Sequence, residues 1–338
     1  MRFACLKRRE FITLIGLATA LPLAVHAQQA ARIPQIGILS PGRPSAVADP
    51  ITNNINSFIQ GLRELGYTEG QNVTIQPEFA EGNADRLSEL ANKLIAAKVD
   101  VIVAFSTTAA RAAKQATSTI PIVAIAMADP VADGLVASLA RPGGNVTGTT
   151  FLGPELVAKR LQLLQEVVPG LSRVAVLWHP QAYSERTMAG VVNGIEVAAR
   201  TLGMQLQLVP AASADDFAGA FAAMSSERAE GLFVFPSPIL FVEYRRIAAM
   251  AAESRLPAIG VAREFADLGG LMSYGVNLSD LSRGTAAHLG KILQGAKPAD
   301  LPVEQPTAFE LVINLKTARE LGLTISRDFL LVADDVIE

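Results

Sequence analysis

The chain has 338 residues, of which 50% are hydrophobic and 18% charged, and its formal net charge is −3. This balance supplies no basic surface for nucleic acid and no cationic face for an anionic membrane. The one cysteine, Cys5, lies in the N-terminal segment, so the rest of the chain can form no disulfide and must depend on a packed core.

The first 27 residues have the pattern of an export signal. The paired Arg8 and Arg9 precede an apolar run from Phe11 to Val25, and small residues end at Ala27. The run is too short for a membrane span, so we expect export with cleavage near Ala27. The Arg-Arg-x-Phe-Ile order fits a twin-arginine signal, and the alternative is an ordinary secretory signal. Without this segment 25 basic and 31 acidic residues remain, a net charge of −6.

Short apolar strands alternate with longer amphipathic helices along the remaining chain. In the first half we expect strands at 36–39, 73–76, 99–105, 120–126 and 146–151. We expect helices at 53–65, from an N-cap at Asp85, at 109–116 and at 133–139. Strands this apolar are buried on both faces, so the pattern predicts an α/β protein with a doubly wound parallel sheet.

The second half repeats this order of elements. The strand ends at Leu39 and Trp178 lie 139 residues apart, and the helix-ending glycines Gly66 and Gly203 lie 137 apart. Two further strands match at offsets of 131 and 136, and the glycine pairs at 143–144 and 269–270 lie 126 apart. We interpret these matches as an internal duplication that gives two similar lobes.

Two parallel-sheet lobes that face each other predict a ligand cleft. Ligands of open parallel sheets lie beyond the carboxyl ends of the strands, and clefts between lobes are common small-molecule sites. The candidate lining residues follow strand ends or lie near the expected passages between lobes: Ser40, Ser106, Thr107, Thr108, Asp129, Thr149, His179, Ser237, Glu264 and Tyr274.

Each of these candidates also has a structural interpretation. The hydroxyls at 106–108 precede a predicted helix and would cap it, although the free N–H groups at a helix start also bind carboxylates. Asp129 precedes a proline and fits a turn with an N-cap. His179 has no partner at metal-ligand spacing, so no metal site is expected. Four aromatic residues could pack in the core or stack on a ligand: Phe151, Trp178, Phe241 and Tyr274.

The segment from Gly143 to Thr150, GGNVTGTT, has the glycine spacing of a phosphate-binding loop. Such a loop needs a preceding strand, a following helix and a lysine, but here the predicted order is helix then strand and Thr149 stands in the lysine position. We therefore interpret both glycine pairs as helix stops that begin crossings between the lobes. A third crossing is expected near Leu301, and Gly148 should lie where the backbone bends or approaches a ligand.

Long segments of the chain resemble the periplasmic solute-binding proteins of a bacterial ABC-transporter family that includes tryptophan-binding-protein-like members. The matching segments are KRREFITLIG near the start, GLRELGYTEGQNVTI at 61–75, ADPVADGLVASLARPGGNVTG at 128–148, REFADLGGLMSYG at 263–275 and LPVEQPTAFELVINLKTARELGL at 301–323. This resemblance implies a type I periplasmic-binding-protein fold with a three-segment hinge, a periplasmic monomer, and delivery of a solute to an ABC permease in the inner membrane.

The resemblance also implies a domain organisation. An export signal at 1–27 is followed by a first lobe from 33–147 and 276–301 and a second lobe from 148–275 and 302–338. A helix at 278–293 should return to the first lobe, and a strand at 309–313 and a helix at 315–321 should belong to the second.

Some positions match those at which relatives hold an aromatic amino acid, namely Ser40, the hydroxyls at 106–108 and Asp129. Relatives usually have Asn-Pro where this chain has His179-Pro180, and often an aspartate where it has Pro236-Ser237. A binding role therefore carries over from the family, and the identity of the ligand does not.

The leading hypothesis is a binding protein without catalysis that captures a small polar or zwitterionic solute, such as an amino acid, between its lobes. The alternatives are an exported sensor that presents its ligand to a membrane receptor, and an exported α/β hydrolase. The sequence has no nucleophile elbow, zinc-protease motif or dinucleotide fingerprint. A carboxylate pair of Asp129 with Glu264 is the one candidate for acid–base work. We expect no enzymatic activity, no cofactor and no nucleic-acid partner.

Overall fold

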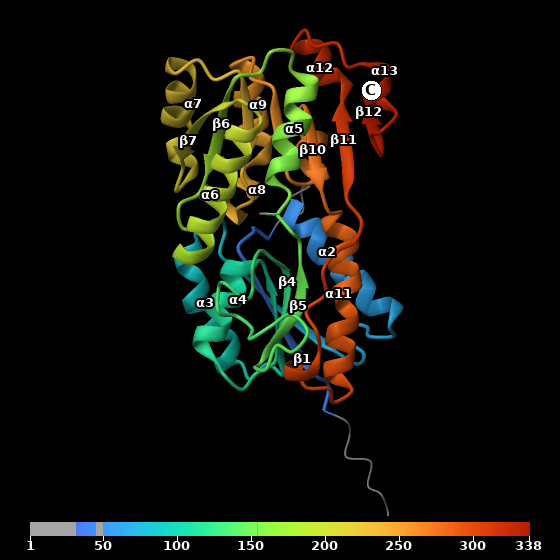
Figure 1. The fold of residues 1–338 in the computed structure, drawn as a ribbon. Helices are drawn as coiled ribbons and strands as arrows, with labels where there is room; N and C mark the ends of the chain where they lie inside the picture. The colour runs from blue at the N-terminus through green and yellow to red at the C-terminus, as the bar shows by residue number, and fades with distance from the viewer. Residues whose placement is uncertain (1–31, 45–49, 154) are drawn as a thin grey trace, which may run out of the picture. The chain divides into compact units, whose positions relative to one another are not determined.

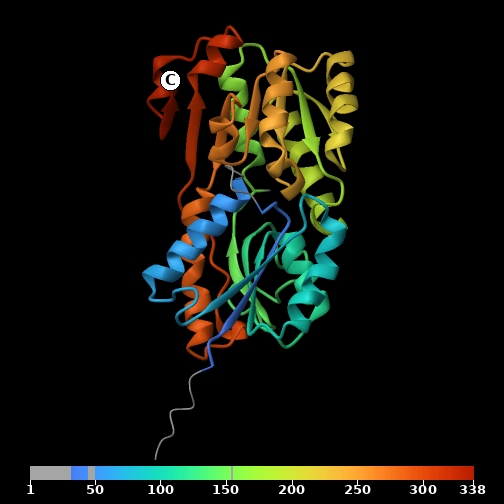
Figure 2. The ribbon, with the colours of Figure 1, turned by 180° about the vertical axis from the view of Figure 1, so that it is seen from behind.

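The two halves of the chain form two separate β-sheets (Figures 1 and 2). The computed structural model describes residues 32–44, 50–153 and 155–338, and residues 34–338 form one unit. The expected export signal, with Cys5 and the paired arginines, lies outside the described residues. Within the described ranges, no helix is long and apolar enough to cross a bilayer.

The first sheet has five parallel strands in the order β2-β1-β3-β4-β5. These are β1 (Gln35–Ser40), β2 (Thr74–Phe79), β3 (Val101–Phe105), β4 (Ile122–Met127) and β5 (Val146–Thr150). Alternate residues of β1 face different cores: Ile36 and Ile38 pack with α2 (Pro50–Glu64), and Leu39 packs with α3 (Leu87–Ala96) and α4 (Thr107–Ala116). Helices thus cover both faces of the sheet, which confirms the doubly wound prediction.

Two helical features predicted for the first half are wrong. Asp85 does not cap a helix, because Asn83 caps a short 3₁₀ helix, η1 (Ala84–Arg86), and accepts the Asp85 N–H at 3.0 Å. Residues 133–139 form turns instead of a helix. Asp129 accepts backbone N–H groups of its own turn, and Gly134 has a φ of +67°, a left-handed conformation that a helix does not contain.

The second sheet has seven strands in the order β7-β6-β8-β9-β10-β11-β12, and β11 is antiparallel to β10. The strands are β6 (Arg173–Trp178), β7 (Gln205–Pro210), β8 (Gly231–Val234), β9 (Ala258–Gly260), β10 (Met272–Gly275), β11 (Glu310–Asn314) and β12 (Asp335–Ile337). Its helices are α5 (Val157–Val167), α6 (Glu185–Thr201), α7 (Phe217–Ser226), α8 (Pro238–Val242), α9 (Tyr244–Glu253), α10 (Arg263–Asp267), α12 (Leu315–Glu320) and α13 (Arg327–Leu330), with a 3₁₀ helix, η2 (Ala214–Asp216).

The internal duplication is confirmed by the strand order. The strands β7-β6-β8-β9-β10 repeat the arrangement β2-β1-β3-β4-β5. Equivalent carboxylates also hold equivalent strand starts: the Asp100 carboxylate accepts the Gln35 N–H at 2.8 Å, and the Glu230 carboxylate accepts the Arg173 N–H at 3.0 Å. The two lobes are therefore variants of one unit, and the second gains β11 and β12 from the end of the chain.

Three segments connect the two sheets, as predicted. Helix α11 (Leu278–Leu293) returns to the first lobe and packs on α2 so closely that a Cβ added to Gly61 would lie 2.3 Å from the Arg283 carbonyl oxygen. After a 3₁₀ helix, η3 (Pro298–Asp300), the third segment runs beside β5, where Glu304 exchanges backbone hydrogen bonds with Gly148 and Thr150 at 2.9 Å. The third crossing thus runs alongside β5, the edge strand of the first sheet.

The segment GGNVTGTT ends inside the first lobe. Strand β5 pairs with β4 as far as Thr150, so the expected lobe boundary at 147/148 falls within a strand and the crossing begins after it. No helix ends at Gly143, whereas Gly269 and Gly270 do end α10 with N–H bonds to its carbonyls. Gly148 has a φ of +135°, and an added Cβ would lie 1.8 Å from the Ala124 carbonyl oxygen. Contact with the neighbouring strand, not with a ligand, therefore explains this glycine.

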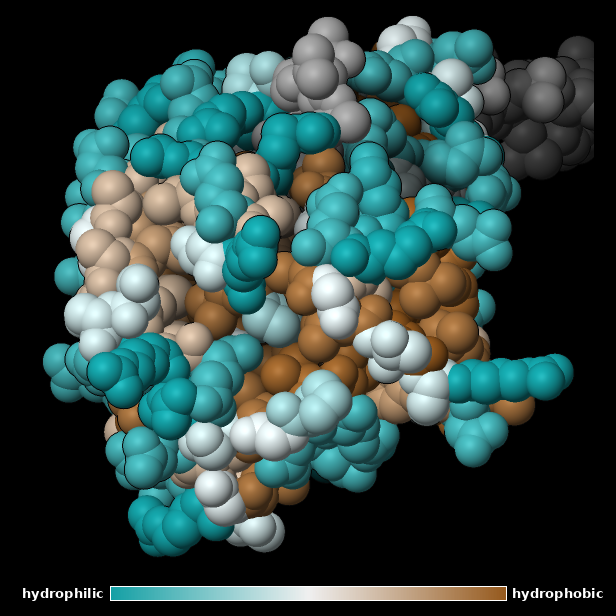
Figure 3. Space-filling model, turned by 90° about the horizontal axis from the view of Figure 1, so that it is seen from above, coloured by the Kyte–Doolittle hydropathy of each residue, from teal (hydrophilic) through white to brown (hydrophobic). Residues whose placement is uncertain are grey.

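Hydrophobic residues also reach the surface of the second lobe. Figure 3 views this lobe from above, with hydrophobic residues across the middle of the face and hydrophilic residues around them. Among the described residues, Leu331 and Val332 are the most exposed large hydrophobics, at 75% and 64%. They follow α13 in the segment that leads to β12.

Candidate ligand-binding cleft

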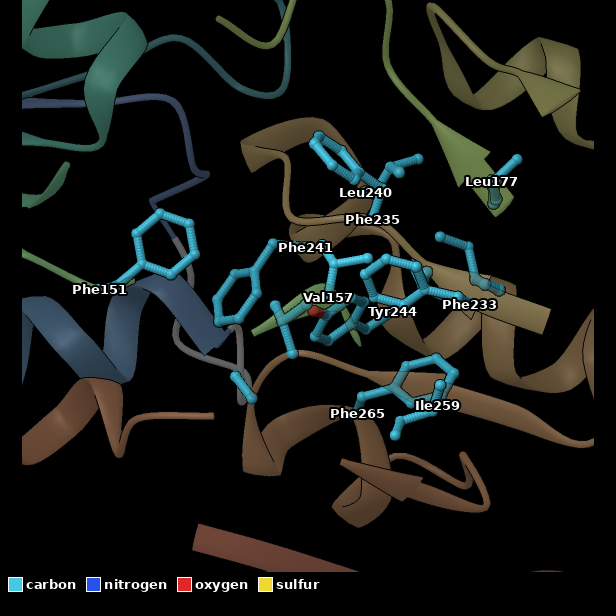
Figure 4. Close-up of a cluster of buried hydrophobic side chains, with 14 of the residues drawn as sticks. Phe151, Val157, Leu177, Phe233, Phe235, Leu240, Phe241, Tyr244, Ile259 and Phe265 are labelled. Atoms are coloured by element: carbon cyan, nitrogen blue, oxygen red, sulfur yellow. The ribbon is translucent and has the colours of Figure 1, made fainter. Parts of the chain in front are cut away.

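A pocket of about 100 Å³ with a mainly apolar lining, here called the apolar pocket, lies between the two lobes. Aromatic rings approach it from both sides, since Phe105 ends β3 and Phe241 belongs to α8. Figure 4 shows Phe241 between Phe151 and Tyr244, and the Phe241 and Tyr244 ring centroids are 4.9 Å apart. The full lining is Pro41, Asn54, Phe105, Ser106, Thr107, Ile125, Ala126, Phe151, Tyr183, Pro236, Ser237, Pro238, Phe241, Val261, Leu278 and Ser282.

Strained backbone gathers at this pocket. Ser106 has a φ of +110° and a ψ of 165°, a region that is almost restricted to glycine. Ala126 and Leu152 also have positive φ values, +58° and +52°, and Leu152 directly follows Phe151 of the lining. Each such residue costs about 1–3 kcal/mol and persists where the surrounding structure imposes it, commonly at a ligand site.

The start of α4 forms the polar edge of the apolar pocket in the first lobe. Ser106 caps the helix, as predicted, by accepting the Ala109 N–H at 3.3 Å, and its hydroxyl lies 2.9 Å from that of Thr108. The Thr107 hydroxyl accepts the Ala128 N–H at 2.9 Å. These hydroxyls mainly hold the loop in place, while the first N–H groups of α4 have no partner within the helix and suit a carboxylate.

The second lobe brings an unpaired hydroxyl to the same pocket. The Tyr183 hydroxyl donates a hydrogen bond to the Pro236 carbonyl at 2.6 Å, which holds in place the backbone of Pro236, the residue before Ser237. Ser237 is 6% exposed, and its Oγ has no hydrogen-bond partner among the described residues. A buried hydroxyl without a partner costs about 1–3 kcal/mol, so a polar group of a ligand would relieve this cost.

A second and larger space between the lobes, here called the polar chamber, has a volume of about 560 Å³. Thr108 and His179 lie in its lining and not in that of the apolar pocket. His179 is 4% exposed, its Nδ1 has no partner among the described residues, and burial lowers its pKa below the usual value. The full lining is Gly82, Asn83, Ala84, Asp85, Leu87, Ser88, Thr108, Arg111, Ala112, Gln115, His179, Gln181, Ala212, Ser213 and Ile239.

Three candidates in the first lobe line neither space. Ser40 is fully buried and its hydroxyl accepts the backbone N–H two residues later. Asp129 accepts N–H groups within its own turn, as the Asp-Pro sequence predicted. The Thr149 Oγ1 lies 3.0 Å from the Oγ1 of Thr285 in α11. Each has a structural role that accounts for its position.

Two candidates in the second lobe also lie outside both linings. Burial raises the pKa of Glu264 to about 7, with a smaller effect from the charge of Asp267. The Tyr274 ring packs 6.2 Å from that of Phe309, centroid to centroid. Among the described residues, no three His, Cys, Asp or Glu side chains are grouped so as to hold a metal ion.

Arg160 joins the first two crossings and was not among the sequence candidates. Its side chain is fully buried, and it donates to the carbonyls of Gly153 at 2.5 Å and Tyr274 at 2.7 Å. Burial lowers its pKa to about 10. It belongs to the apolar stripe of α5, one turn after Val157 and beside Leu161. An arginine on such a stripe is the sequence signal that could have revealed it.

Polar contacts connect the lobes directly. The Asp133 Oδ1 of the first lobe accepts hydrogen bonds from the Ser184 N–H and the Thr187 hydroxyl, both at 2.9 Å, at the start of α6. On another side, the guanidinium of Arg43 lies 2.7 Å from the Glu243 carboxylate. A carboxylate at a helix N-terminus is favourable, so Asp133 stabilises the approach of the two lobes.

Two lobes of equal strand order, three connecting segments and a pocket lined from both sides define a two-lobed ligand-binding protein of the type I periplasmic-binding-protein fold. The family model described as "ABC transporter substrate binding protein" matches residues 47–337. The chain belongs to this family of ABC-transporter substrate-binding proteins.

Solved structures support the same assignment. A conserved domain protein from Vibrio cholerae has a TM-score of 0.83 at 26% identity, over 90% of this chain and 100% of that chain. A domain from Streptococcus pneumoniae in complex with L-Trp has a TM-score of 0.81 at 27% identity, over 90% and 99%. A ligand-free, open substrate-binding protein from Clostridium difficile has a TM-score of 0.63 at 25% identity, over 90% and 99%.

A curated relative is the "Tyrosine-binding protein" of Clostridioides difficile (strain R20291). It is 27% identical over 273 residues, which cover 79% of this chain and 75% of the relative. At nearly equal identity, the TM-score is higher for the L-Trp complex than for the ligand-free, open structure.

Proposed function

We propose that this protein is the solute-binding component of an ABC importer and that it captures a zwitterionic solute with an apolar or aromatic body between its lobes. The observation that carries this proposal is the apolar pocket, because Phe105 and Phe241 reach it from different lobes. The start of α4 and the unpaired Ser237 hydroxyl add polar groups beside the apolar walls. Relatives named for L-Trp and tyrosine favour an amino acid.

The volume of the apolar pocket limits the body of this solute. An apolar cavity of about 150 Å³ holds a benzene molecule. The apolar pocket, at about 100 Å³, is smaller than that cavity, so it has room for at most one ring or one branched aliphatic group. Phenylalanine, tyrosine and leucine should therefore bind better than tryptophan.

The remaining parts of the proposal follow from the family and from the N-terminal sequence. The family consists of substrate-binding proteins, which favours binding without catalysis over hydrolysis. The export-signal pattern at 1–27 favours a periplasmic location and delivery to a permease of the inner membrane. We propose a monomer because a cleft that opens and closes needs no second subunit.

Thermal unfolding in the presence of an amino-acid and metabolite library tests the binding proposal. A solute at one hundred times its Kd should stabilise the folded state by about 2.7 kcal/mol and raise the unfolding midpoint. Native mass spectrometry of freshly purified protein should show the same solute bound. The proposal fails if no solute in a broad library raises the midpoint and none co-purifies.

Uptake by cells separates an importer from a sensor. Deleting the gene should abolish uptake of the labelled solute identified by the thermal screen. Unchanged uptake, together with loss of a transcriptional or chemotactic response to the solute, would instead support the sensor alternative.

A further inference from the structure

One face of α4 is directed at the polar chamber. Thr108, Arg111, Ala112 and Gln115 all line it, and their spacing of i, i+3, i+4 and i+7 is that of a single helical stripe. The stripe starts at Thr108, in the same turn as the apolar-pocket residue Thr107. The chamber therefore has an ordered polar wall on the first-lobe side.

Arg111 is the only arginine or lysine in this lining among the described residues. It is half-buried, and its guanidinium makes no hydrogen bond or ion pair within the described part of the chain. Elsewhere in the structure, Arg43 and Arg173 pair with carboxylates. A guanidinium offers five donors in a planar fork that fits a carboxylate, so Arg111 has an unused binding capacity directed into a cavity.

The opposite wall also has unused hydrogen-bonding capacity. His179 is only 4% exposed, and its Nδ1 has no hydrogen-bond partner among the described residues. Burial lowers its pKa, which keeps the imidazole neutral near pH 7 and leaves Arg111 as the cationic group of the chamber. Asp85 is the one carboxylate in the described lining, and it is exposed at the rim. The chamber thus presents an unpaired cation opposite an unpaired neutral ring.

The chamber and the apolar pocket are immediate neighbours. Thr107 lines the pocket and Thr108 lines the chamber, while on the second-lobe side Pro238 lines the pocket and Ile239 the chamber. Adjacent residues of both lobes therefore separate the two spaces. A solute whose apolar body fills the pocket can therefore extend its polar end into the chamber.

We propose that the polar chamber is the subsite for the carboxylate of the captured solute and that Arg111 is the residue that binds it. This inference rests on the proposed function, because it concerns the polar end of the same solute. It assigns specificity to a residue one turn inside α4, beyond the capping hydroxyls at 106–108. The alternative is that the polar chamber binds a free small anion, separate from the solute, through the same guanidinium.

Isothermal titration with matched probes tests the inference. The probes are L-phenylalanine, L-tyrosine and L-leucine, their primary amides, which lack the carboxylate, and inorganic phosphate as the free anion. The variants are Arg111→Gln, Arg111→Lys and the control Arg200→Gln, which changes an exposed arginine in the last turn of α6.

Wild-type protein should prefer the acids to the amides at least tenfold. Arg111→Gln should weaken acid binding roughly 10- to 100-fold, leave amide binding unchanged and so abolish the preference. Arg111→Lys should be intermediate because a lysine keeps the charge without the planar fork. Arg200→Gln should behave as wild type, and all variants should keep the wild-type unfolding midpoint without ligand.

Three outcomes would overturn the inference. If Arg111→Gln keeps the preference for acids, the carboxylate is bound elsewhere, as at the N–H groups of α4. If phosphate binds through Arg111 without weakening acid binding, the chamber holds a separate anion. If no acid or amide binds wild-type protein, the choice of an amino acid with an apolar body as the solute fails before any variant is compared, which distinguishes that failure from a wrong role for Arg111.

Discussion

Removing the carboxylate of Asp133 should weaken solute binding without damaging either lobe. Asp133 accepts two hydrogen bonds across the cleft, from the Ser184 N–H and the Thr187 hydroxyl, each at 2.9 Å. The start of α6 keeps its own cap in the variant, because the Ser184 hydroxyl accepts the Thr187 N–H. Asp133→Ala therefore affects mainly the state in which the lobes are together.

The magnitude follows from these two bonds. A hydrogen bond to a charged group contributes about 1.5–3 kcal/mol net, and the lower value suits the half-buried Asp133. Two bonds then amount to about 3 kcal/mol, which corresponds to a roughly 150-fold loss of affinity because the solute is held by the closed lobes. Asp133→Asn keeps an acceptor oxygen without the charge, so it should lose about 1 kcal/mol, roughly fivefold.

Titration with the solute identified by the thermal screen measures this effect. A pair of dyes, one on each lobe, should report a more open population for Asp133→Ala in the absence of solute. The control is Asp215→Ala, which removes the same charge from an exposed position on η2. If Asp133→Ala binds within about threefold of wild type, the contact does not contribute to closure and this reasoning is wrong.

Three further predictions concern stability. In a denaturant titration, Gly148→Ala should destabilise the protein by about 3 kcal/mol or more, because the added Cβ would lie 1.8 Å from the Ala124 carbonyl oxygen. The control Gly144→Ala adds its Cβ in open space and should be nearly neutral. Arg160→Ala should cost about 3 kcal/mol through two lost charged hydrogen bonds, and a midpoint shift of under 1 °C would contradict that role. Burial raises the Glu264 pKa from 4.5 to about 7. Between pH 4.5 and pH 7 the Glu264 carboxyl therefore keeps its proton in the folded state and has lost it in the unfolded state. The stabilisation from this protonated carboxyl is therefore full below pH 4.5 and is lost as the pH rises to 7. Glu264→Gln should remove this decrease, which amounts to at most about 3 kcal/mol, from a plot of the free energy of unfolding against pH.

Features encoded by neighbouring residues could be predicted from the sequence. The cap at Ser106 follows from a hydroxyl between an apolar strand and a helix, and the structure confirms it. The duplication could be recognised because the strands and helix stops recur in one order, and the shared strand order confirms it. Helix 278–293, which the family resemblance implied, has the bounds of α11. Periodicity and caps are local properties, so they survive in a single sequence.

Features that depend on distant partners could not be predicted. The segment 133–139 was expected to be a helix, yet its Asp133 bonds a residue 51 positions away. Arg160 bonds a carbonyl 114 positions away, and no local pattern gives that pairing. Of the ten candidate site residues, Ser106, Thr107 and Ser237 line the apolar pocket and Thr108 and His179 the polar chamber. The other five line neither space, because the end of a strand predicts a position at the edge of the sheet and not whether a side chain reaches a cavity. The roles of all ten residues in binding are proposals.

The three connecting segments have a consequence for the order in which the protein is made. The five strands of the first sheet end at Thr150, but the helix that covers α2 with buried Ala286, Leu289 and Ile292 is synthesised much later. The second sheet likewise needs β11 and β12, which end at Ile337. Neither lobe is a continuous stretch of chain, so a fragment that stops at Thr150 should expose an uncovered apolar face and aggregate. The first lobe becomes complete only after α11 has been synthesised, and the second only after β12, so most of the two-lobed chain must leave the ribosome before either lobe is finished.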